Sequence, residues 1–159
     1  NGRFLADQVD VQINLSSGAQ IPQIASGAIA NGASFQLGGA QAPGTLISIL
    51  GQNLADRAEV GLGQSPLPFE LAGIEVRLGD RRLPLLYAGP NQINAQIPYD
   101  LPLNTQHQLI VRRGSALSVP ETLSLGPSQP AVFTQNQAGT GQGAIVNGVT
   151  NVLADGSNP

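Results

Sequence analysis

The chain has 159 residues, enough for one domain with a hydrophobic core of its own, and it contains no cysteine, which excludes disulfides, thiol chemistry and cysteine-ligated zinc. Only 11% of its residues are charged and the formal net charge is -3, so no long-range field attracts it to nucleic acid or to anionic lipid. The 20 glycines and 12 prolines are typical of short β-strands joined by many turns, and no apolar segment reaches the ~18 residues that a membrane-spanning helix needs.

The first predicted element is a strand over residues 9–15. Its apolar residues alternate with polar ones, which places one apolar row on one face. These residues are Val9, Val11, Ile13 and Leu15. A flexible polar linker follows, so residues 1–23 are predicted to form an N-terminal strand arm. An isolated strand is not stable in water, so we expect this arm to pair with a sheet edge of its own domain or of a neighbouring chain.

Residues 24–126 are predicted to form a β-sandwich. The segment 24–41 leads into it, with Phe35 as the expected anchor. One short helical turn is expected around residues 56–60. A hairpin is expected between strands 74–78 and 83–88, because Gly79 and Asp80 favour a tight turn.

Further apolar alternation predicts strands over residues 45–50, 93–97, around Leu109 and over 116–125. The inward faces of the strands predict the core. Its expected members are Ile47, Ile49, Ile74, Val76, Ile93, Ile97, Leu109 and Val111. Residues 127–159 are predicted to form a small C-terminal β extension with short strands near 131–133 and 143–146.

Two segments carry a resemblance to a known family. Residues 42–54 read APGTLISILGQNL, and residues 85–98 read LLYAGPNQINAQIP. They resemble the immunoglobulin-like TIG (IPT) fold and, more closely, the Solibacter-type C-terminal domain of acidobacterial exported proteins. Residues 27–35, 139–145 and 157–159 match the same family pattern.

The resemblance implies an all-β, immunoglobulin-like (TIG/IPT-type) β-sandwich, flanked here by the strand arm and the small C-terminal β extension. In that family a second β-unit follows the closing Ser-Asn-Pro. Because residue 1 is Asn rather than Met, we expect a processed chain or part of a longer one.

Candidate chemistry is sparse. His107 is the only histidine, and no nucleophile-elbow motif accompanies it. The glycines at 139, 141 and 143 are similar to a phosphate loop, but a strand rather than a helix is predicted to follow them, and lysine is absent. Asp155 alone is too few ligands for calcium. We therefore predict no catalytic, cofactor-binding or metal site and no cofactor.

Arginines beside the two predicted hairpins are the remaining candidates. Arg77, Arg81, Arg82, Arg112 and Arg113 could form one basic strip for docking a protein, since arginine is favoured at interfaces. The alternative is a solvated strand face whose charges are balanced by Glu75 and Asp80. The predicted interaction residues are thus the four apolar residues of the arm together with Arg81, Arg82, Arg112 and Arg113.

These observations favour a non-enzymatic, extracytoplasmic protein-interaction or structural module in a surface or periplasmic assembly. Its expected partners are other protein chains, bound by strand addition or side-by-side docking, with no nucleic acid and with homo- or hetero-oligomers both open. One alternative is an accessory subunit docked on a membrane complex, such as an electron-transfer complex. Another is a carbohydrate-binding or hydrolase-associated module, although the chain has no tryptophan and only two tyrosines for a sugar-binding platform.

Overall fold

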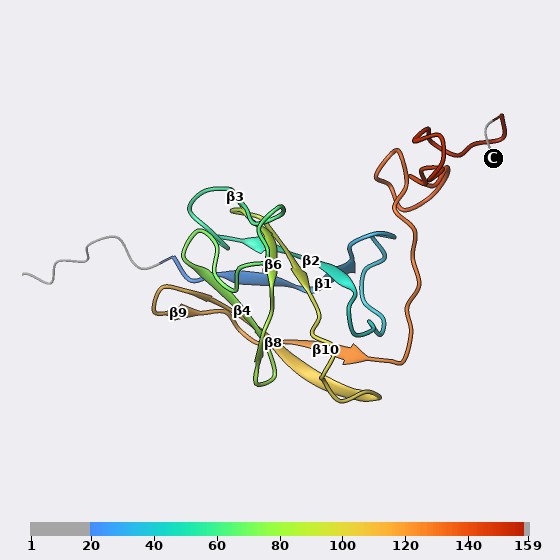
Figure 1. Cartoon of the computed structure of the whole chain (residues 1–159). Coiled ribbons are helices and arrows are strands. Elements are labelled where there is room, and N and C mark those ends of the chain that lie inside the picture. Colours follow the sequence, from blue (N-terminus) through green and yellow to red (C-terminus); the bar gives the residue numbers. More distant parts are fainter. Residues whose placement is uncertain (1–19, 158–159) are drawn as a thin grey trace, which may run out of the picture.

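The computed structural model describes residues 20–157 and is a β-sandwich of two antiparallel sheets (Figure 1). Within these residues there is no helix. The first sheet has the order β1-β2-β7-β6-β3 and the second has the order β10-β8-β4-β5, with β9 paired to β8. The strands are β1 (Gln23–Asn31), β2 (Leu46–Gln52), β3 (Glu59–Val60), β4 (Ile74–Leu78), β5 (Arg81–Arg82), β6 (Leu85–Ala88), β7 (Gln92–Gln96), β8 (Thr105–Arg113), β9 (Ala116–Leu117) and β10 (Glu121–Leu125).

The core lies between the sheets and contains every residue predicted for it. Each side chain of that set has no exposed surface, because alternate residues of each strand point inward. The confirmed residues are Ile47, Ile49, Ile74, Val76, Ile93, Ile97, Leu109 and Val111. Period-two alternation therefore identified the inward face of four strands, β2, β4, β7 and β8, correctly.

The two segments that carry the family resemblance are neighbours in space. β2 and β7 pair antiparallel, from Leu46 opposite Gln96 to Leu50 opposite Gln92. Gly51, in the first segment, lies where a Cβ would be 2.0 Å from the carbonyl oxygen of Gln23 on β1. The close approach of the β1 backbone thus accounts for a glycine at this position.

The hairpin predicted for residues 74–88 is wrong in its second strand. β4 pairs with the two-residue β5, while β6 belongs to the other sheet, beside β7. The backbone N–H of Leu83 still donates to Val76, at 2.9 Å. The next residue, Pro84, has no N–H to continue the ladder, and the chain crosses between the sheets there.

Two other local predictions are also wrong. No helical turn occurs around residues 56–60, where Glu59 and Val60 form β3 against β6. Phe35 is 41% exposed and does not anchor the lead-in segment. Ile29 and Ala30 do so instead, because they are buried within β1.

Residues 127–157 form the C-terminal extension, which lies outside the two sheets (Figure 1). The short strands predicted here are absent from this described stretch. Isolated bridges join Thr134 to Gly143 and Val146 to Leu153.

Gly139 places the extension against the sandwich. Its φ is +73°, and a Cβ there would lie 1.9 Å from the carbonyl oxygen of Ser34, in the turn after β1. The glycine pattern over 139–143 therefore has a packing role at its first position.

Candidate functional site

The outer face of the second sheet carries one carboxylate surrounded by guanidinium groups. The strand register sets Glu75 of β4 opposite Arg112 of β8, and Arg77 of β4 opposite Arg82 of β5. Residues two apart on a strand share a face, so Glu75 and Arg77 project from the same side. These three strands therefore bring the four side chains together.

Three arginines lie within ion-pair distance of the same carboxylate. The shortest N–O distances to Glu75 are 3.3 Å for Arg112, 3.5 Å for Arg82 and 3.7 Å for Arg77. Arg112 also lies 4.0 Å from Glu70. We call Arg77, Arg82 and Arg112 the arginine platform.

Glu75 is buried although it belongs to an outward-facing row. It is 6% exposed, whereas the arginine side chains of the platform are 39–52% exposed. The arginines cover the carboxylate with their stems and keep their charged ends in water. Glu75 and Asp80 thus balance arginines of the predicted strip, as the alternative of a balanced strand face predicts, but Glu75 itself is buried beneath them rather than solvated.

The arginines also determine the ionisation of Glu75. Burial alone would raise the pKa of its carboxyl, but hydrogen bonds and charges from Arg112 and Arg82 outweigh this and hold the pKa below its ordinary value. At neutral pH the carboxylate is thus ionised, and the platform carries three positive charges around one negative charge.

The predicted basic strip is divided. Arg82 and Arg112 belong to the platform, whereas Arg81 pairs with Asp100, at 2.8 Å, and with Asp80. Arg113 pairs with Asp56 and donates to the carbonyl of Asn53. Arg81 is therefore separated from Arg82, and Arg113 from Arg112, because neighbouring residues of a strand point to opposite faces.

One member of the site was missed. The guanidinium of Arg82 lies 5.1 Å from the centre of the Phe69 ring, a cation–π distance. Phe69 comes from a segment with no strand periodicity, so the sequence held no signal for this contact. The other predicted interaction residues, Val9, Val11, Ile13 and Leu15, lie outside the described residues.

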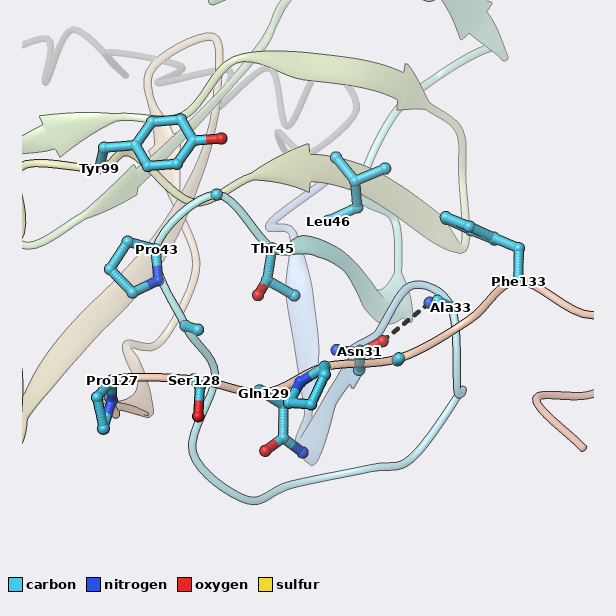
Figure 2. Close-up of a pocket in the computed structure, with 14 residues that line it drawn as sticks. Asn31, Ala33, Pro43, Thr45, Leu46, Tyr99, Pro127, Ser128, Gln129 and Phe133 are labelled. Atoms are coloured by element: carbon cyan, nitrogen blue, oxygen red, sulfur yellow. Dashed lines mark hydrogen bonds between the residues drawn. The ribbon is translucent and has the colours of Figure 1, made fainter. Parts of the chain in front are cut away.

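A separate cleft lies at one end of the sandwich (Figure 2). Its volume is about 550 Å³, and it is bounded by the Pro43–Thr45 turn, by Tyr99 and by the Pro127–Phe133 segment of the extension. A Cβ on Gly44 would lie 2.6 Å from the Tyr99 ring. The cleft brings together no acid–base pair, because none of its lining residues carries a charge.

The remaining candidates stay isolated within residues 20–157. His107 is hydrogen-bonded through Nε2 to the carbonyl of Pro102, at 2.9 Å. In this part of the chain no three His, Asp or Glu side chains converge as a metal site would require. Nor does this part include a helix with the length and apolar character needed to cross a bilayer.

The extension exposes an unusual amount of apolar surface. Seven of its large hydrophobic residues are exposed, by 41% to 93%. They are Val132, Phe133, Ile145, Val146, Val149, Val152 and Leu153. We call them the apolar row.

One member of the apolar row, Phe133, also lies against the first sheet. Phe133 lines both the end cleft and a cavity of about 410 Å³ on the outer face of that sheet, beside Leu46, Leu86 and Tyr87. Sequence periodicity could not reveal this surface, because the extension has no regular strand.

No protein-family model matches this chain, and no curated protein matches it.

Proposed function

We propose that the chain is an immunoglobulin-like module of the TIG (IPT) type that belongs to the Solibacter-type C-terminal domain family. The strand order supports this fold. The series β1-β2-β7-β6 and β10-β8-β4 correspond to strands A-B-E-D and G-F-C of a constant-type immunoglobulin domain. The pairing of the two signature segments on β2 and β7 supports the family assignment.

The module acts by binding protein, as a structural or accessory subunit of an extracytoplasmic assembly. The apolar row carries this proposal. Seven large apolar side chains are exposed between residues 132 and 153, and exposed apolar surface gathered in one segment marks a site that another protein can cover. Val149, at 93% exposed, and Ile145, at 53%, would both lose apolar surface to water-excluding contact with such a partner.

The chain offers a matched control for this function. Val119, between β9 and β10, is 82% exposed and lies outside the extension. A charge at Val119 should therefore perturb solvation as a charge at Val149 does, without touching the apolar row.

The experiment compares Ile145→Asp/Val149→Asp with Val119→Asp in the native full-length protein, carrying an affinity tag. Native-mass analysis of the extracytoplasmic fractions should show wild type and Val119→Asp in the same assembly. The double variant should shift to lower mass, because two buried charges oppose the contact. An unchanged mass for the double variant would refute the proposed function.

The fraction that holds the assembly separates the forms of this function. Recovery from the secreted or surface fraction indicates a structural subunit. Recovery from the membrane fraction, dissociated by the same double variant, indicates an accessory subunit docked on a membrane complex. Recovery from the cytoplasm alone would contradict export.

A further inference from the structure

We propose that the arginine platform binds an acidic protein segment through its carboxylates; this inference rests on the proposed function, whose partner it describes. The platform lies on the outer face of β4, β5 and β8. It is distinct from the apolar row, which belongs to the extension.

The platform has more positive charge than its own structure neutralises. Three guanidinium groups surround the single carboxylate of Glu75, and Glu70 reaches only Arg112, at 4.0 Å. The whole chain has seven cationic residues, and three of them meet here although the net charge is -3. An anion placed over this face would meet a local field opposite to that of the rest of the protein.

Hydrogen-bonding capacity is also left over. A guanidinium has five N–H donors. Arg82 donates to Glu75, Arg77 donates to the carbonyl of Asp80, and Arg112 donates to Glu75 and to the carbonyl of Gly114. Their exposed fractions of 39–52% leave the other donors facing water. These donors can take a carboxylate in the bidentate geometry that arginine favours.

The side chains are held before any partner arrives. Glu75 accepts hydrogen bonds from Arg82 and Arg112, the Asp80 carbonyl accepts one from Arg77, and the Phe69 ring supports Arg82 at 5.1 Å. A long side chain that is already ordered loses less entropy on binding, which favours recognition over a mobile charged surface.

The expected partner is a protein segment with several carboxylates rather than a nucleic acid. The open face of a sheet suits an extended or flat protein surface. A polyanion longer than the platform would meet the negative field of the remaining chain, and this cost grows with the length of the polyanion.

The test uses a fluorescent hexaglutamate peptide as the probe and the full chain at low salt. Arg82→Gln/Arg112→Gln should weaken binding about tenfold or more, because two charged donors are lost. Arg57→Gln is the control, since the Arg57 side chain is 71% exposed and pairs with Glu59 of β3, which belongs to the other sheet. That variant should bind as wild type does, and higher salt should weaken binding in both.

Glu75→Gln separates recognition from a structural role. Glu75→Gln removes the internal negative charge but keeps a side-chain oxygen that can accept from Arg82 and Arg112, so the arginines stay ordered and hexaglutamate should bind more tightly, even though the folding stability falls. Circular dichroism confirms the fold before the titration. If Glu75→Gln does not fold, Arg77→Gln, an exposed position, takes its place and should weaken binding.

Three results would overturn the inference. One is equal binding by wild type and Arg82→Gln/Arg112→Gln. Another is equal loss in Arg57→Gln, which indicates nonspecific attraction. The third is tighter binding of an oligonucleotide than of hexaglutamate. The proposed function is judged separately, from the native mass of Ile145→Asp/Val149→Asp. If that variant shifts to lower mass while Arg82→Gln/Arg112→Gln binds hexaglutamate as wild type does, the proposed function holds and the inference fails.

Discussion

Arg112 and Glu75 face each other across β8 and β4, with their side chains 3.3 Å apart and the carboxylate buried. The same pair links stability to recognition. Glu75 orders the arginines, and it also cancels part of the charge that they offer to a partner.

The ion pairs of Glu75 should make folding sensitive to acid. The pKa of this carboxyl is lower in the folded protein than the ordinary value of about 4.3 that it has in the unfolded chain. Its contribution is therefore complete above about pH 4.3 and is lost as the pH falls through the folded pKa.

Denaturant midpoints of wild type and Glu75→Gln, measured between pH 7 and pH 2, check this linkage. The difference between them should be constant above about pH 5 and shrink toward zero in acid. A difference that is the same at both ends of the range would show that the ionised form of Glu75 does not stabilise the fold.

Truncation of the core should be costly. Ile93 is fully buried on β7, so Ile93→Ala should lower the free energy of unfolding by about 2–5 kcal/mol through lost burial and a cavity. Chemical denaturation measures this. Val149→Ala, at a residue that is 93% exposed, is the control and should leave the midpoint of the isolated chain unchanged. Similar midpoints for the two variants would show that Ile93 is not buried and that the register assigned to β7 is wrong.

A Cβ at Gly44 should displace the Tyr99 ring, which is 77% exposed and can turn toward water. The φ of Gly44 is +80°, which costs a residue with a Cβ about 1–2 kcal/mol, and the Cβ would also meet the tyrosine ring. Gly73→Ala provides the backbone cost alone, because Gly73 has a φ of +74° and open space around it.

Gly44→Ala should therefore destabilise the protein slightly more than Gly73→Ala does, the excess being the lost contact with the Tyr99 ring. In a Tyr99→Ala background, Gly44→Ala should cost no stability through the ring contact, but should still cost the stability lost through the positive φ at position 44. Equal effects of the two glycine variants in thermal unfolding would indicate that the ring does not pack on Gly44.

Gly139 should control how the extension contacts the sandwich. An alanine there would place its Cβ on the carbonyl of Ser34, whereas Gly148→Ala, also in the extension, meets open space. In the wild-type protein the Gly139 amide donates to Thr134 Oγ1, at 3.0 Å. Hydrogen exchange of the amide at position 139 and of its neighbours should therefore accelerate in Gly139→Ala and not in Gly148→Ala. Unchanged exchange across residues 134–140 would rule out this contact in solution.

The sequence predicted the core because burial between two sheets requires only strict alternation within each strand. Residues 81–88 were predicted less well. Arg81 to Ala88 has the composition of one strand, and only Pro84 marks the place where the chain changes sheets.

The candidate site depended still more on tertiary structure. Arginines near two turns could be found in the sequence, but the register of β4 against β8 decides that Glu75 meets Arg112 and that Arg113 turns away. Val149 is likewise exposed because no other described part of the chain packs over it, and a local sequence pattern cannot predict this.

The most direct measurement of the central claim is covalent carbene footprinting of Val149 and Val119, in the isolated chain and in the native preparation. Both valines are exposed in the structure, at 93% and 82%, so both should be labelled strongly in the isolated chain. In the native preparation the labelling of Val149 should fall several-fold while that of Val119 is unchanged, since a protein surface covers the apolar row. Equal labelling of Val149 in both preparations would contradict a role in protein binding.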